Sequence, residues 1–100
     1  MEIGKEMNQG TYDVTLRGKF TFSDHIEFRE VLRKIEDKDV TQIVFHLGNL
    51  EFVDSTGLGM LLLALDAAES QQKKLTITGA MGQVKKMFDL ARFHTLFSMA

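Results

Sequence analysis

One segment, residues 52–63 with the sequence FVDSTGLGMLLL, constrains the fold more than any other part of the chain. Three polar residues separate an apolar pair from a very apolar run: Asp54, Ser55 and Thr56. Such residues are favoured at helix N-caps, so the segment predicts a turn into an apolar helix. Gly57 and Gly59 lie in the first turns of that helix, where each costs about 1 kcal/mol relative to alanine. A chain accepts this cost when something must approach its backbone closely.

Short strands and amphipathic helices alternate along the rest of the chain. Strands are predicted at residues 2–7, 11–16, 42–47 and 74–78, where apolar residues alternate with polar ones or form short runs. Asn8, Gln9 and Gly10 mark a turn between the first two strands, and residues 17–23 are predicted to be a loop. The strand at 42–47 is predicted to end at Gly48 and Asn49 and to be buried on both faces.

Three helices complete this pattern. The first is predicted to begin at Ser23 or Asp24, because Asp24 and Glu27 have the spacing of a capping box. Helices at about residues 56–70 and 83–91 follow. Three apolar residues near the end close the core as a last strand or helix: Phe93, Leu96 and Phe97.

The resulting order, β-β-α-β-α-β-α plus a terminal element, predicts an α/β fold in a single domain, residues 1–100. The opening hairpin is antiparallel, and right-handed crossovers make the later strands parallel, so the sheet is mixed with helices packed against it. Functional sites of such folds gather where strands end and helices begin. The segment around Ser55 is the connection of this kind that carries the polar cluster.

Composition excludes several classes of function. The 12 basic and 14 acidic residues give a net charge of -2, which argues against binding nucleic acid through bulk electrostatics. Without cysteine, disulfides and thiolate metal sites are excluded. The first ten residues lack the apolar region of a signal peptide, and the longest apolar run, residues 60–65, is too short to span a bilayer. We expect a soluble, cytoplasmic protein with no membrane contact.

The predicted helix at residues 56–70 carries two apolar stripes, although a helix on a sheet needs only one buried face. One stripe comprises Leu58, Leu61, Leu62, Leu65 and Ala68, and the other comprises Met60, Leu63, Ala64 and Ala67. The second stripe is either covered by a neighbouring helix or left exposed for a partner.

The polar cluster does not match known catalytic motifs. A serine hydrolase of the G-x-S-x-G type would need a glycine two residues before Ser55, where Val53 stands. His46 lies in the middle of an apolar strand, where a core histidine is expected, and His25 and His94 have no helical spacing that would form a metal site. The glycines form no nucleotide-binding fingerprint. We therefore expect no enzymatic activity, no cofactor and no metal.

Phosphorylation fits the segment better. A serine at a helix N-terminus lies beside free N–H groups and the positive end of the helix dipole, which favour a dianion. Phosphate would add about -1.5 to -2 charges to a small surface patch. If that patch carries Met60, Leu63 and Ala64, the added charge opposes binding of an apolar partner surface.

The motif V-D-S-T-G-L-G, after the apolar strand and before the apolar helix, resembles the hallmark of bacterial STAS-domain anti-sigma factor antagonists. The opening hairpin, Gly18 at the end of its second strand, and the late V-K-K-M-F-D-L stretch are also similar. The resemblance implies a small mixed sheet with helices packed on one side. It also implies phosphorylation of Ser55, within a motif that includes Asp54, Thr56, Gly57, Leu58 and Gly59.

The resemblance further implies the partners of the domain. These are an anti-sigma factor that is also a serine kinase of the histidine-kinase-like ATPase type, and a PP2C-type serine phosphatase. The unphosphorylated antagonist binds the kinase and frees the sigma factor, as a monomer or weak dimer. An alternative is a STAS scaffold or sensor subunit in a two-component, flagellar, biofilm or stress signalling complex.

This chain departs from many members of the family after Gly18. A lysine and two phenylalanines follow, where an acidic residue is common in the family. Phe20 and Phe22 are either exposed contacts for a partner beside Ser55 or core residues that anchor a loop.

Overall fold

The opening hairpin pairs β1 (Glu2–Asn8) with β2 (Thr11–Phe20) in a computed structural model that describes residues 1–91 and 98–99. Asn8 lies opposite Thr11, which leaves a two-residue turn. Gln9 and Gly10 have φ angles of 51° and 87°. Positive φ at both central residues is the geometry of a type I′ turn, whose twist matches that of the flanking strands.

The sheet has the order β1-β2-β3-β4-β5. Its later strands are β3 (Gln42–Val53), β4 (Lys74–Thr78) and the two-residue β5 (Ser98–Met99), and each runs parallel to its preceding neighbour. The predicted mixed sheet is therefore confirmed. The terminal element is observed only as β5, since Phe93, Leu96 and Phe97 lie outside the described residues.

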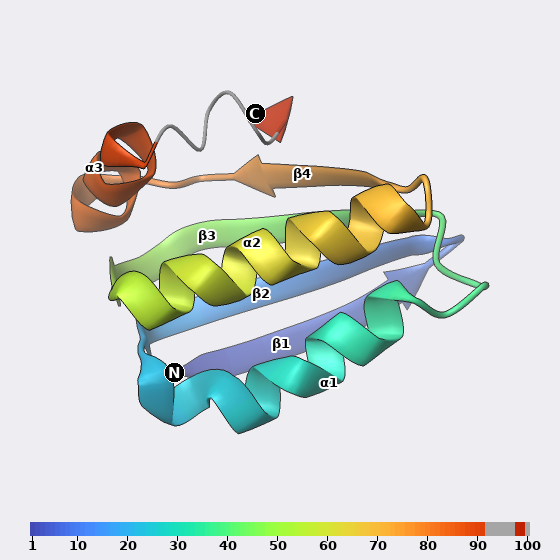
Figure 1. The fold of residues 1–100 in the computed structure, drawn as a ribbon, viewed down its shortest axis with the longest axis horizontal. Helices are drawn as coiled ribbons and strands as arrows, with labels where there is room; N and C mark the ends of the chain where they lie inside the picture. The colour runs from blue at the N-terminus through green and yellow to red at the C-terminus, as the bar shows by residue number, and fades with distance from the viewer. Residues whose placement is uncertain (92–97, 100) are drawn as a thin grey trace.

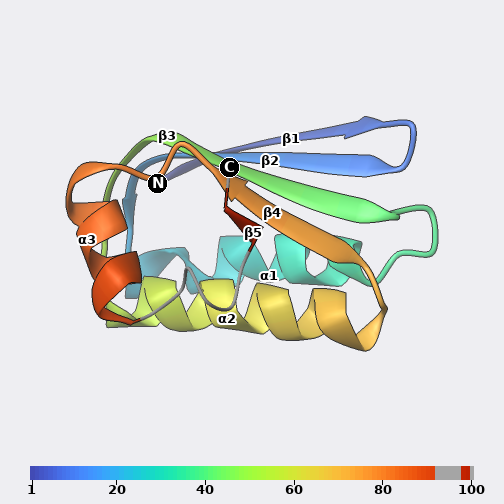
Figure 2. The same cartoon turned by 90° about the horizontal axis from the view of Figure 1, so that it is seen from above.

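The long helices α1 (His25–Ile35) and α2 (Ser55–Ser70) lie side by side on one face of the sheet, as Figures 1 and 2 show. The shorter α3 (Gly82–Leu90) lies at one end of the sheet and packs against β3. The sheet and the helices both contribute side chains to the core. Its largest fully buried side chains include Phe20, Phe28, Phe45 and Phe88. In the part of the chain described, no helix combines the length and hydrophobicity required to cross a bilayer.

β2 and β3 are longer than predicted. The predicted loop after residue 16 is the end of β2, and β3 continues through Gly48 and Asn49 to Val53. The two strands remain paired up to Phe20 opposite Val53, with register shifts after Thr15 and after Gly18. The turn-forming residues Gly18, Gly48 and Asn49 lie at or next to these register shifts, inside a continuous strand pairing. The local sequence signals therefore placed the ends of both strands too early.

The start of α1 also differs from the prediction. A single 3-10 turn, η1 (Phe22–Asp24), precedes α1, and the capping box joins Thr21 to Asp24 rather than Asp24 to Glu27. The Asp24 carboxylate is buried, accepts a hydrogen bond from the Thr21 N–H at 2.9 Å, and lies 3.2 Å from the N-terminal amine of Met1. Asp24 therefore fastens the connection between β2 and α1.

His46 lies on the sheet face opposite α1 and α2, and the predictions of a core histidine and of a strand buried on both faces are wrong. Its side chain is 42% exposed, its Nε2 lies 2.7 Å from Asp13 Oδ1, and its Nδ1 lies 3.3 Å from Thr78 Oγ1. Val44 on the same face is only half-buried. The long helices of the described chain cover only one face, so the alternate residues of β3 keep contact with solvent.

Candidate functional site

Ser55 is the first residue of α2 and lies where β3 ends at Val53. Its side chain is exposed, and no hydrogen bond among the described residues uses its hydroxyl. Asp54 precedes it in extended conformation, with φ of -94° and ψ of -177°, and is the N-cap of α2. The strand-to-helix connection thus presents a free hydroxyl at one end of the helical layer.

The Asp54 carboxylate has two structural roles. One oxygen accepts a hydrogen bond from the Gly57 N–H at 2.7 Å, which caps the helix. The other accepts from the Phe22 N–H at 3.3 Å, which ties the start of α2 to η1. The Asp54 N–H itself donates to the Phe20 carbonyl at 3.1 Å. The residue before Ser55 is consequently held on both sides.

Helix geometry leaves the first N–H groups of α2 without partners inside the helix. Asp54 accepts from the Gly57 N–H, and the Leu58 N–H donates to the Asp54 carbonyl at 3.0 Å. Within the described chain, the N–H groups of Ser55 and Thr56 have no acceptor of this kind. Two donors and the positive end of a 16-residue helix therefore lie beside the Ser55 hydroxyl.

The two glycines of the motif have different surroundings. A Cβ added at Gly57 would lie 2.6 Å from Val53 Cγ2 and 2.7 Å from the Phe20 carbonyl oxygen. A Cβ added at Gly59 would meet no atom within 4 Å beyond the adjoining backbone of its own helix. The close approach expected from the sequence is therefore made at Gly57 by the chain's own β2 and β3, whereas the surface over Gly59 is open.

Gln83, which the sequence analysis did not identify, supports the same connection from α3. Its side-chain Oε1 accepts from the Val53 N–H at 3.0 Å, and its Nε2 donates to the Val53 carbonyl at 3.1 Å. The pairing of β3 with β4 ends earlier, where His46 lies opposite Thr78. The amide of Gln83 thus makes the two bonds that a neighbouring strand would make. It acts across 30 residues of sequence, so no local pattern could reveal it.

The structure divides the predicted partner surface. Three of its members are buried and are not available to a partner: Phe20, Met60 and Ala64. The Phe20 ring packs against that of Phe28, with centroids 4.8 Å apart. α1 lies along α2, and within the second apolar stripe Met60 and Ala64 are buried and Ala67 is partly buried. Of that stripe only Leu63 is strongly exposed, at 50%.

Phe22, the remaining member of the predicted surface, is 63% exposed beside the Asp54 carboxylate. Its ring stacks on that of His25, with centroids 4.6 Å apart and an interplanar angle of 22°. His25 Nδ1 also lies 2.8 Å from the Phe22 carbonyl oxygen. This double contact holds an apolar ring in solvent next to the Ser55 connection.

The family model described as "Mlab, STAS domain" matches residues 3–98. The chain belongs to this STAS-domain family. The resemblance predicted from the DSTGLG motif is thereby confirmed.

Named relatives agree with this assignment. The chain is 28% identical over 87 residues to a STAS-domain containing protein of Pseudomonas aeruginosa, a match that covers 87% of this chain and 85% of that protein. It is 29% identical over 79 residues to the anti-sigma-B factor antagonist of Staphylococcus epidermidis, covering 79% of this chain and 73% of that protein.

Solved structures show the same fold. The anti-sigma factor antagonist SpoIIAA in its unphosphorylated form superimposes with a TM-score of 0.79 at 21% identity, covering 99% of this STAS domain and 87% of that chain. The phosphorylated form of the Bacillus protein SpoIIAA also gives a TM-score of 0.79, with 91% of that chain covered. At this identity the likeness establishes the arrangement of strands and helices, which confirms the predicted STAS fold.

Proposed function

We propose that this STAS domain is an anti-sigma factor antagonist whose binding to its partner is switched off by phosphorylation of Ser55. The observation that carries the proposal is the exposed Ser55 hydroxyl at the N-terminus of α2, beside free N–H groups and the exposed ring of Phe22. Relatives that bear the name anti-sigma-B factor antagonist support the same role. In this role the domain is a cytoplasmic, non-enzymatic regulator.

The switch has a simple electrostatic basis. Phosphorylation would add about -1.5 to -2 charges at a position where the free hydroxyl is neutral. The N–H groups at the helix start can hold the phosphate without rearrangement of the core. A partner surface that buries Phe22 would, in contrast, have to desolvate the phosphate and the neighbouring Asp54 carboxylate. The phosphorylated domain therefore keeps its fold and loses its partner.

The partners proposed are an anti-sigma factor with serine kinase activity of the histidine-kinase-like ATPase type and a PP2C-type phosphatase. The kinase would both bind the domain and modify it, and the phosphatase would restore the binding form. That SpoIIAA has been solved in unphosphorylated and phosphorylated forms with the same likeness to this chain supports a fold that tolerates the modification.

Phosphosite mapping tests the assignment of Ser55. The domain is incubated with its kinase and ATP, and the labelled residue is identified by mass spectrometry. We expect a single phosphate on Ser55, no labelling of Ser55→Ala, and full labelling of the matched control Thr56→Ala. Persistent labelling of Ser55→Ala would overturn the proposal.

A mimic of the phosphate tests the switch itself. Ser55→Asp should leave the circular dichroism spectrum unchanged but raise the dissociation constant for the kinase more than tenfold, which corresponds to about 1.4 kcal/mol. Equal affinity of both forms would contradict a charge-operated switch. Co-purification with a large assembly instead of one kinase-sized protein would favour the scaffold alternative.

A further inference from the structure

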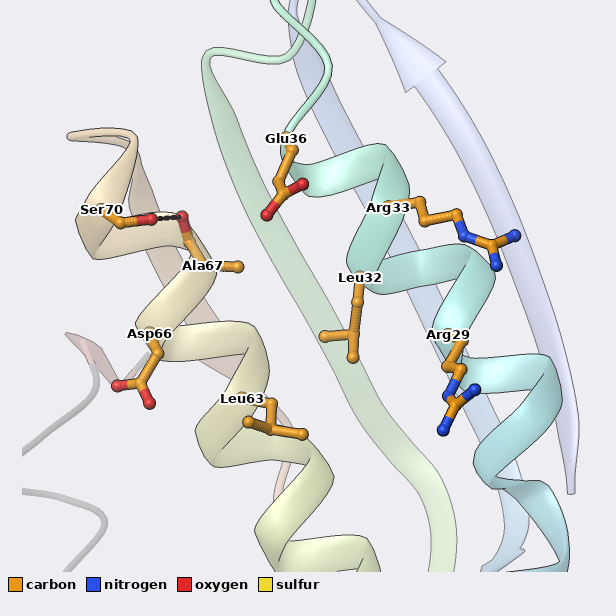
Figure 3. Close-up of a pocket in the computed structure, with 8 residues that line it drawn as sticks. All are labelled: Arg29, Leu32, Arg33, Glu36, Leu63, Asp66, Ala67 and Ser70. Atoms are coloured by element: carbon orange, nitrogen blue, oxygen red, sulfur yellow. Dashed lines mark hydrogen bonds between the residues drawn. The ribbon is translucent and has the colours of Figure 1, made fainter.

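A groove runs between α1 and α2 on the surface that faces away from the sheet (Figure 3). Its volume is about 420 Å³, and the two helices that form it run in the same direction (Figure 1). Leu32 of α1 and Leu63 of α2 point into it from opposite sides. The remaining lining residues are Arg29, Arg33, Glu36, Asp66, Ala67 and Ser70.

Opposite charges lie at the two ends of this groove. Arg29 borders the end nearer the start of α1, and Glu36 borders the other end (Figure 3). Neither forms an ion pair within the described residues, whereas Arg33 points away from the groove and pairs with Glu30 at 2.9 Å. Seven residues separate the two charges, which corresponds to about 10.5 Å along a helix axis.

The apolar side chains that line the groove also differ in size from one end to the other. Leu63 is half exposed, whereas Ala67, one turn further along α2, has a small side chain that is partly buried. Leu32 lies opposite the interval between them (Figure 3). Each half of the groove therefore carries what the other half lacks: one has a cation and a large side chain, the other an anion and a small one.

We propose that this groove is a homodimer interface, occupied by the same groove of a second copy in antiparallel orientation. The two-fold axis lies in the plane between the two copies, at right angles to the helices and level with Leu32. The helices of the second copy therefore run in the opposite direction. Arg29 of each copy then faces Glu36 of the other, and Leu63 of each faces the small side chain of Ala67 of the other. One operation satisfies both the charge and the size asymmetry, as an isologous interface requires.

A two-fold axis parallel to the helices would instead place α1 of each copy over α2 of the other. Arg29 and Glu36 would then no longer face each other, so the charges also select the antiparallel orientation. The antiparallel arrangement leaves the phosphorylation segment free. Ser55 precedes Leu63 by eight residues, or about 12 Å along the helix, and lies beyond the end of the paired region. The dimer is independent of the proposed switch and compatible with it.

Sedimentation equilibrium of the full chain at concentrations from about 10 µM to about 1 mM tests the interface. We expect a reversible monomer–dimer equilibrium, weak because the apolar floor is small. Arg29→Glu and Glu36→Arg should each raise the dissociation constant at least tenfold, because each substitution changes two ion pairs in the dimer. Lys86→Glu, a charge reversal of the same size on α3 and outside the groove, should leave the constant unchanged.

Mixing the two variants separates this interface from any other effect of the substitutions. An equimolar mixture of Arg29→Glu and Glu36→Arg should dimerise again, since each chain then carries two like charges that face two opposite charges. The double variant should also dimerise with itself. A wild-type chain that stays monomeric throughout the concentration range, or two variants that fail to associate while both remain folded by circular dichroism, would overturn the proposal.

Discussion

The two glycines in the first turns of α2 differ in the space around them. On the inner side, Gly57 is buried between Val53 and the Phe20 carbonyl, with no room for a methyl group. On the outer side, Gly59 faces open space. Two glycines with the same expected cost in a helix therefore have different causes: one is required by the packing of the fold, and the other is not explained by any contact inside the described chain.

Gly57→Ala should give the largest effect on stability. The added Cβ would meet a backbone oxygen at 2.7 Å, which cannot rotate away as a flexible side chain could. Overpacking of this kind costs roughly 1–3 kcal/mol, and we expect the upper end, reduced by about 1 kcal/mol of improved helix propensity. Urea denaturation should show a net loss of about 2 kcal/mol. An unchanged midpoint would mean that α2 can move away from β2 without penalty.

The fold was largely predictable because its signals are local and periodic. The alternation of strands, the helical stripe that buries Phe28, Val31 and Ile35, and the polar residues before α2 each follow from neighbours in sequence. The ends of β2 and β3 were not predictable. The pairing of β2 with β3 continues past Arg17 and Asn49, through residues that normally form turns. Its energy depends on residues that are more than 30 positions apart in the sequence.

The site was predictable at its centre and not at its margins. Asp54 was recognised by residue type, because carboxylates cap helices wherever helices begin. The tie from Asp54 to Phe22 and the amide contacts of Gln83 join distant segments and leave no periodic signal. The sequence left open whether the second stripe of α2 is covered by a neighbouring helix or exposed for a partner. Only the tertiary arrangement shows that α1 lies along α2 and that Met60 and Ala64 are buried while Leu63 is not.

Asp54→Ala should have an intermediate effect on stability, because Asp54 makes hydrogen bonds both to α2 and to η1. It removes the cap on the Gly57 N–H and the bond to the Phe22 N–H. Loss of an N-cap costs about 0.5–2 kcal/mol, and we expect a value near the upper end. Asp54→Asn retains an acceptor oxygen and should recover most of the stability in the same denaturation experiment. If both variants lose equally, the negative charge rather than the hydrogen bond stabilises the start of α2.

Gly59→Ala should have the smallest effect, and it should stabilise. A methyl group there meets nothing within 4 Å beyond the adjoining backbone of its own helix, so the gain in helix propensity, up to about 1 kcal/mol, is not opposed by packing. The variant should be tested both for its urea midpoint and for its rate of Ser55 phosphorylation.

If the open surface over Gly59 is kept for the close approach of a kinase, the variant should be more stable than the wild type and phosphorylated more slowly. A variant that is more stable and phosphorylated at the wild-type rate would show that Gly59 is not part of the kinase contact. Ala64→Gly is the matched control, because it changes helix propensity in the opposite direction at a buried position and should reduce stability without touching the surface beside Ser55.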